Sequence, residues 1–269
     1  MSPIIQTMEF ESRILYPALS EIADAAKHVA KAIPELLWPT TCVICDKPGE
    51  ILCKDCMQEL PFIDRWRACS SCGAPMCAMQ CTECNATALR GFEISKLPFD
   101  DAAQALALTD DVFRMIVAYK DGGEMRMGEV LAKMMLSYLE PHLAASLGKS
   151  GALTYVPASR DALQRRGFDH AKLLAKHISD ASGIRCLHLF EQPVSKDQRL
   201  LNKKERFENA MRSIHLKEDT KQIKLPESIL IIDDVYTTGS TMFAASIALK
   251  NAGAKHIHVL CCARGMDVR

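Results

Sequence analysis

Residues 229–241 read ILIIDDVYTTGST and indicate the fold of the larger part of the chain. Four apolar residues lead into two adjacent carboxylates, and a turn of hydroxyl side chains with one glycine follows. A short, continuous apolar run is typical of a strand that is buried on both faces of a parallel sheet. Open parallel sheets bind their ligands at the carboxyl ends of the strands. The acids and the turn therefore mark a candidate binding site.

Apolar strands alternate with amphipathic helical segments on both sides of this stretch. The predicted strands cover residues 152–159, 185–190, 228–235 and 256–264. The predicted helical segments cover residues 110–120 and 127–143, a loop and helix over 161–183 that ends at Gly183, and residues 241–253. Alternation of this kind predicts an α/β domain from about residue 95 onward, with a parallel sheet covered by helices on both faces.

Two further regions precede that domain. Residues 1–37 carry apolar residues at alternating steps of four and three, which predicts a helix that ends near Pro34. Residues 38–94 are rich in cysteine and proline and have little apolar periodicity, so a hydrophobic core alone cannot stabilise them. We therefore expect a helical extension (1–37), a cysteine-rich module (38–94) and the α/β domain (95–269).

Composition and charge limit the classes of protein that fit. The 269 residues are 48% hydrophobic and 25% charged, as in ordinary globular proteins. No apolar run approaches the roughly 18 residues that a transmembrane helix needs, and Glu9 and Glu11 interrupt any signal-peptide core. We expect a cytoplasmic protein without membrane insertion. The net charge is zero, but residues 160–224 hold 15 basic against 9 acidic side chains, a balance that suits a polyanionic ligand.

Nine of the twelve cysteines lie between Cys42 and Cys84, and eight of them form four C-x-x-C pairs. Two such pairs supply the four thiolates of a structural zinc site, so the spacing predicts one or two structural Zn²⁺ ions. Pairing consecutive motifs is the simplest assignment, an interleaved pairing is the alternative, and an iron–sulfur cluster would use the same ligands. The expected ligands are Cys42, Cys45, Cys53, Cys56, Cys69, Cys72, Cys81 and Cys84. Cys77 either replaces Cys81 or stays unliganded, and Cys261 and Cys262 are expected in the core.

The acid pair and the turn suit the two halves of a ribose phosphate. Carboxylates such as Asp233 and Asp234 accept hydrogen bonds from the hydroxyls of a sugar. The following Thr-Thr-Gly-Ser-Thr turn stands before a predicted helix, where backbone N–H groups and the helix dipole favour a phosphate. The nucleoside-triphosphate motif G-x-x-x-x-G-K-[ST] does not occur in the sequence. The alternative interpretations are a metal-binding acid pair and a plain turn with a helix cap.

The stretch 229–241 resembles the 5-phosphoribosyl-1-pyrophosphate (PRPP) motif of type I phosphoribosyltransferases. Over residues 36–265 the chain is also similar to the ComF/GntX family. This resemblance rests on the segments LLWPTTCVIC, CSSCGAP, YKDGGEMRMGEVLA, VPASRDALQRRGFDHAKLLAK, QRLLNKKERFENAM and VLCCARG. It implies a type I phosphoribosyltransferase domain, with a Rossmann-like parallel sheet, preceded by a double zinc ribbon.

The resemblance also implies roles for particular residues. Asp233 and Asp234 would contact the ribose hydroxyls, and the 5-phosphate would lie against Thr237, Thr238, Gly239, Ser240 and Thr241. A pyrophosphate loop would include Ser159 and Arg160, followed by Arg165 and Arg166, and a flexible loop would contribute Gln198, Arg206 and Asn209. Mg²⁺ would accompany the PRPP. As alternatives, the arginines are surface charges or pair with neighbouring glutamates. His170 is expected to be a cap or a surface residue, and Tyr236 is assigned no role.

The resemblance implies a PRPP-binding protein of natural transformation that handles incoming single-stranded DNA with a helicase-like ATPase as partner. One alternative is an active phosphoribosyltransferase, a glycosyltransferase that moves ribose 5-phosphate to a base or an amine. Another is a regulatory protein that senses PRPP.

Overall fold

The computed structural model describes residues 39–77, 80–139, 141–194, 202–220 and 224–265. The chain divides into two compact units, Met1–Cys53 and Lys54–Arg269, and each is described by itself. The helix predicted for residues 1–37 lies outside the described residues. The division into three domains at residues 37 and 94 stays a prediction.

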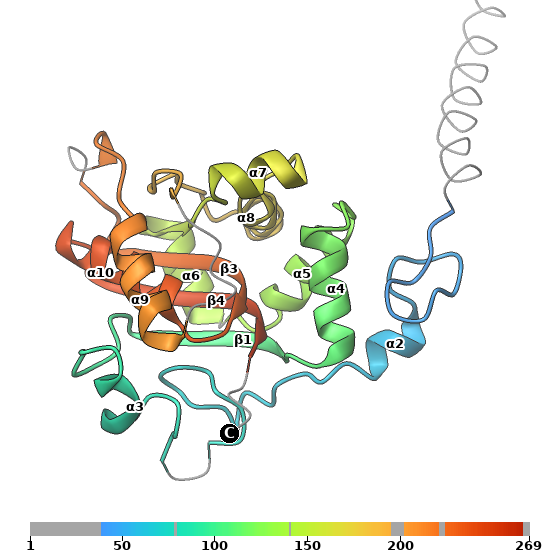
Figure 1. Ribbon diagram of the computed structural model, residues 1–269, viewed down its shortest axis with the longest axis horizontal. Helices are drawn as coiled ribbons and strands as arrows, with labels where there is room; N and C mark the ends of the chain where they lie inside the picture. The colour runs from blue at the N-terminus through green and yellow to red at the C-terminus, as the bar shows by residue number, and fades with distance from the viewer. Residues whose placement is uncertain (1–38, 78–79, 140, 195–201, 221–223, 266–269) are drawn as a thin grey trace, which may run out of the picture. The chain divides into compact units, whose positions relative to one another are not determined.

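A parallel sheet forms the centre of the second unit (Figure 1). Its four strands are β1 (Asp101–Ala107), β2 (Ala152–Tyr155), β3 (Ser228–Tyr236) and β4 (His256–Arg264), in the spatial order β1-β4-β3-β2. Every neighbouring pair is parallel, and β3 pairs with β4 from Ser228 opposite His256 to Tyr236 opposite Arg264. The apolar run of β3 is buried, as expected for a central strand with helices on both sides.

Helices cover both faces of this sheet, so the predicted α/β class is confirmed (Figure 1). Ile229 and Ile231 of β3 share an apolar core with Phe243 on one face, where α9 and α10 pack together. The alternate side chains of β3 point to the other face, where α5 and α8 contact the strands. The described helices are α2 (Lys54–Gln58), α3 (Ala86–Arg90), α4 (Asp110–Lys120), α5 (Met127–Leu136), α6 (Pro141–Ser150), α7 (Arg160–Arg166), α8 (His170–Ser182), α9 (Lys203–Ser213) and α10 (Ser240–Asn251).

Glycine ends the two helices that follow β2. Gly167 after α7 and Gly183 after α8 adopt left-handed backbone conformations, with φ of 77° and 73°, and each donates its N–H to a carbonyl of the preceding turn. The predicted helix end at Gly183 is confirmed. No helix among the described residues is both long enough and apolar enough to span a bilayer.

The structure corrects the predicted strands at two places. Residues 185–190 were predicted as a strand but pair with β2 only through a single bridge between Leu153 and Cys186. After two backbone hydrogen bonds to Leu153 the segment leaves the sheet, and Phe190 pairs with Leu216 instead. Strand β1 was not predicted, because its sequence DAAQALA contains no β-branched or aromatic residue.

Candidate functional site

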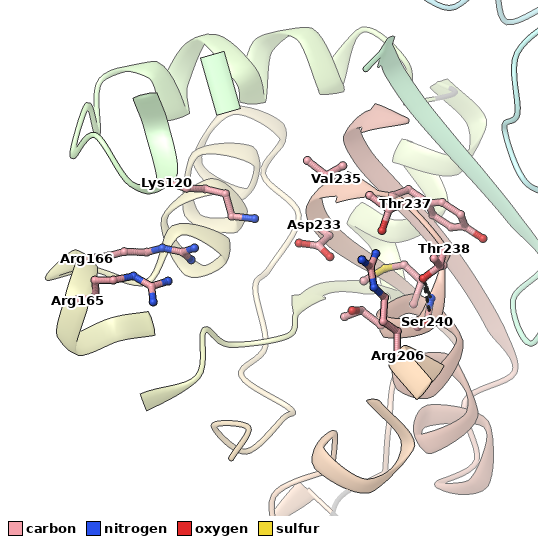
Figure 2. Close-up of a pocket in the computed structure, with 13 residues that line it drawn as sticks. Lys120, Arg165, Arg166, Arg206, Asp233, Val235, Thr237, Thr238 and Ser240 are labelled. Atoms are coloured by element: carbon pink, nitrogen blue, oxygen red, sulfur yellow. Dashed lines mark hydrogen bonds between the residues drawn. The ribbon is translucent and has the colours of Figure 1, made fainter. Parts of the chain in front are cut away.

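A cavity of about 410 Å³ opens at the carboxyl end of β3 (Figure 2). Four segments that are distant in the sequence meet around it: the end of α4, the last turn of α7, helix α9, and the chain from β3 into α10. The lining residues are Lys120, Arg165, Arg166, Arg206, Asp233, Val235, Tyr236, Thr237, Thr238, Gly239, Ser240, Thr241 and Met242. The cavity lies where a parallel sheet places its ligands, at the carboxyl end of a central strand.

The turn between β3 and α10 is shaped for an anion. Gly239 stands immediately before α10 and has a φ of 78°, a left-handed conformation that favours glycine. The hydroxyls of Thr238 and Ser240 lie 2.8 Å apart, and the Ser240 N–H donates to the Thr238 hydroxyl over 3.4 Å. Because α10 begins at Ser240, its first N–H groups and the positive end of its dipole lie at the cavity.

The two acids at the end of β3 have different surroundings. Asp233 lines the cavity, whereas Asp234 is 2% exposed and its Oδ2 lies 2.6 Å from the Lys120 ammonium. Burial opposes the ionisation of Asp234, but the Lys120 ammonium lowers the pKa of this carboxyl below its usual value. Burial and the neighbouring Asp234 raise the pKa of Asp233 above its usual value. Asp234 therefore completes an ion pair behind the cavity, and Asp233 is the carboxyl that a ligand meets.

His170 lies beside these acids and is buried, so the expectation of a cap or surface residue is wrong. One nitrogen of its ring and one carboxylate oxygen each of Asp233 and Asp234 lie within 4.8 Å of one another. Burial, followed by the positive charges of Lys120 and Arg166, lowers the pKa of His170 to about 4, so the imidazole is neutral at pH 7. The cap of α8 is instead Asp169, whose side chain accepts from the Lys172 N–H.

Four cationic side chains line the cavity from two sides. Lys120, Arg165 and Arg166 come from one side of the cavity, and Arg206 reaches over the turn from α9 (Figure 2). The Arg166 guanidinium is held in place by two groups, since its Nε donates to Asp121 at 2.8 Å and its Nη1 lies 3.1 Å from His170 Nδ1. Fixed cations facing a helix N-terminus suit a ligand with several phosphate groups.

Most of the predicted site residues line this cavity. They are Asp233, Thr237, Thr238, Gly239, Ser240, Thr241, Arg165, Arg166 and Arg206. Ser159 and Arg160 lie outside the described lining. Ser159 caps α7 by accepting from the Ala162 N–H, and Arg160 is the first residue of that helix. Asn209, on α9, also lies outside it, and its Nδ2 is buried without a partner among the described residues. Gln198 falls outside the described residues.

Lys120 and Tyr236 line the cavity but were not predicted as site residues from the sequence. Lys120 ends α4 and pairs with Asp234. It belongs to the segment YKDGGEMRMGEVLA, which carries the family resemblance, but no role was predicted for it. A lysine in the last turn of a helix is usually a surface residue, so a single sequence contains no signal for this contact. Tyr236, which was assigned no role, is buried at the base of the turn.

The cysteine motifs form two tetrads, each from consecutive C-x-x-C pairs, as the simpler prediction had it. The first contains Cys42, Cys45, Cys53 and Cys56, and the second contains Cys69, Cys72, Cys81 and Cys84; in each, the four Sγ atoms lie within 4.8 Å of one another. Distances of 3.6–3.7 Å separate the sulfurs of Cys45 and Cys53, of Cys69 and Cys84, and of Cys72 and Cys81.

These distances fit zinc. A regular tetrahedron with Zn–S bonds of about 2.3 Å has sulfurs about 3.8 Å apart. Four thiolates also leave no open coordination position, which is the pattern of structural rather than catalytic zinc. Cys77 packs beside the second tetrad but is not one of its four members, and Cys261 and Cys262 are buried in the core as expected.

Comparison with known proteins gives one informative match. No protein-family model matches the chain. The competence protein ComFC of Streptococcus pneumoniae is 26% identical over 206 residues, which cover 77% of this chain and 84% of that protein. The likeness extends over most of both chains, and the paired cysteine tetrads and the parallel α/β sheet have the arrangement expected from the motifs. Together these findings agree with the resemblance to the ComF/GntX family.

Proposed function

We propose that this protein binds PRPP at the carboxyl end of β3 and acts in the cytoplasm during natural transformation. The observation that carries the proposal is the cavity that brings Asp233, the turn from Thr237 to Thr241 and four cations together. The turn and the start of α10 suit the 5-phosphate, Asp233 suits the ribose hydroxyls, and the cations suit the diphosphate. The relative ComFC is a competence protein, which supports the biological setting.

Magnesium fits this arrangement as a companion of the ligand. Mg²⁺ prefers oxygen ligands and is commonly held by one or two carboxylates together with substrate phosphates. Asp233 is the one carboxylate in the described lining of the cavity, and Asp234 is already paired with Lys120. The protein therefore contributes few oxygen ligands. When bound, the ion would neutralise part of the charge of the diphosphate.

Calorimetry with PRPP and Mg²⁺ on the zinc-loaded protein tests the proposal. We expect the Asp233→Asn variant to bind PRPP at least tenfold more weakly, because the amide is a poorer acceptor for the ribose hydroxyls. Arg212→Ala is the matched control, because Arg212 pairs with Glu208 on the surface of α9 and lies outside the described lining, and its affinity should stay within twofold of wild type. The proposal fails if the wild-type protein shows no binding, or if Asp233→Asn binds as tightly as wild type.

The action on single-stranded DNA is the second part of the proposal. Arg165 and Arg166 present adjacent cations at the cavity mouth, and backbone phosphates are bound by such side chains. Gel shifts at low salt should detect binding of single-stranded DNA that weakens with salt and with Arg165→Ala. Arg212→Ala on α9 is the control, because Arg212 pairs with Glu208 on the surface. Undetectable binding at low salt would exclude direct DNA handling, and co-purification with a helicase-like ATPase would then be the remaining route to this function.

A transferase with turnover is the alternative function, favoured by the same cation-lined cavity. It predicts release of pyrophosphate from PRPP in the presence of a base or an amine, abolished by Asp233→Ala combined with Asp234→Ala. PRPP binding without turnover across such acceptors would instead favour a protein that senses PRPP.

A further inference from the structure

A buried arginine lies between the second cysteine tetrad and the turn of the cavity. Arg264 is the last residue of β4 and is 2% exposed. Its Nη1 donates a hydrogen bond of 3.1 Å to the carbonyl oxygen of Cys72, a member of the second tetrad. The carbon of its guanidinium lies 4.1 Å from the centre of the Tyr236 ring, a cation–π contact within a shielded environment.

Tyr236 continues this chain of contacts to the turn. It is Arg264's partner in the register of β3 and β4, and the Gly265 N–H donates to its carbonyl oxygen at 2.8 Å. Its Oη lies so close to Gly239 that a Cβ placed on the glycine would stand 2.4 Å from it. The tyrosine ring therefore supports the residue that precedes α10, and a displaced ring would displace the turn.

The charge of the tetrad explains what keeps Arg264 in place. Four thiolates around one Zn²⁺ have a net charge of −2, and they lie beside a buried guanidinium that needs a counter-charge. The nearest carboxylate with a described contact, that of Glu83, is 3.8 Å from Arg264 Nη2 and lies within the same knuckle as Cys81 and Cys84. Without a metal, nothing holds the four sulfurs around one point, and the Cys72 carbonyl that accepts from Arg264 loses its support.

We infer that zinc in the second tetrad positions the phosphate-binding turn through Arg264 and Tyr236, so that zinc and the phosphorylated ligand bind cooperatively. Arg264 and Tyr236 are then positioning residues, because neither needs to touch the ligand's phosphates. The ligand half of this inference rests on the proposed function. By thermodynamic reciprocity, the factor by which zinc tightens the ligand equals the factor by which the ligand tightens zinc.

Amide hydrogen exchange tests the positioning without any ligand. We expect faster exchange of residues 236–241 after a chelator has removed zinc from the second tetrad. Cys45→Ser, which disables only the first tetrad, is the control and should leave exchange in this segment unchanged. Unchanged exchange after zinc has left the second tetrad would overturn the inference, whether or not PRPP binds.

The reciprocal affinities test the cooperativity. PRPP with Mg²⁺ should strengthen zinc retention against a chelator about five- to 150-fold, the usual range of such coupling, and zinc should strengthen PRPP by the same factor. Arg264→Met should remove the coupling, and Arg264→Lys, which keeps the cation, should restore part of it. If Arg264→Met does not fold, the zinc–PRPP coupling measured in wild type and in Arg264→Lys by the metal titration still tests the inference. Equal zinc affinity with and without bound PRPP would refute the coupling, whereas a loaded wild-type protein that binds no PRPP would refute the proposed function.

Discussion

Replacing Lys120 with methionine would expose the cost of an unpaired acid behind the cavity. Methionine keeps most of the length of the lysine stem but removes the ammonium that lies 2.6 Å from Asp234 Oδ2. The side chains of Lys120 and Asp234 are 23% and 3% exposed, so water cannot replace the lost charge at the aspartate. His170 is a poor substitute cation, since burial, the largest cause of its lowered pKa, remains in the variant.

The magnitude follows from the burial of the pair. Removing one partner of a fully buried ion pair costs about 3–5 kcal/mol of unfolding free energy. Because Lys120 is partly exposed, the loss for Lys120→Met at pH 7 should lie near the lower end, at about 3 kcal/mol. Adding Asp234→Asn removes the unpaired charge, so the double variant should recover part of this loss. The coupling energy between the two sites should reach about 2 kcal/mol.

Urea unfolding followed by circular dichroism measures these free energies. Lys133→Met is the matched control, because Lys133 pairs with Glu129 on the surface of α5 and both side chains are more than 60% exposed. Such exposed pairs contribute about 0.3–0.5 kcal/mol. The reasoning would be refuted if Lys120→Met cost no more than Lys133→Met, or if the losses from Lys120→Met and Asp234→Asn were simply additive.

Three further predictions concern the turn, the histidine and the metal. Gly239→Ala should cost more unfolding free energy than Gly183→Ala. Both glycines have left-handed backbones, in which an alanine costs about 1–2 kcal/mol, but only at Gly239 would the added Cβ also clash with Tyr236. Urea titrations of the two variants compare these losses, and equal losses would contradict the close approach of Tyr236 to Gly239. Burial lowers the pKa of His170 in the folded protein to about 4, so between pH 6.5 and 4 the unfolded chain takes up a proton that the folded protein does not. The wild-type protein should therefore lose up to about 3 kcal/mol of unfolding free energy relative to His170→Gln as the pH falls through this range. Parallel pH profiles of the two unfolding free energies would contradict this. Cys77→Ser should retain two zinc ions per chain by elemental analysis and Cys81→Ser only one, and the reverse result would assign Cys77 as a ligand.

The sequence was sufficient to predict the elements whose local pattern agrees with their final environment. The apolar run of β3, the acids after it and the glycine before α10 lie in one continuous stretch, so their proximity needs no tertiary information. The four C-x-x-C pairs likewise constrain their own geometry. These features predicted the α/β class, the position of the cavity and the two tetrads.

The remaining features depend on tertiary contacts that a single sequence does not contain. Lys120 reaches Asp234 from a helix more than a hundred residues earlier in the chain, and Arg264 reaches Cys72 from the last strand. Strand β1 has weak strand propensity and forms because β4 offers it a row of partners from His258 to Arg264. For residues 185–190 the mismatch is reversed: their apolar pattern predicts a strand, but they form only one bridge to β2.

Mapping of amide chemical shifts during a titration with PRPP and Mg²⁺ tests the central claim most directly. The largest shifts should belong to the backbone N–H groups of Thr237, Thr238, Gly239, Ser240 and Thr241, with smaller shifts at Asp233 and Arg166. The same titration of Asp233→Asn should need at least tenfold more ligand. Saturable shifts located elsewhere, with the turn before α10 unaffected, would contradict the assignment of this cavity as the PRPP site.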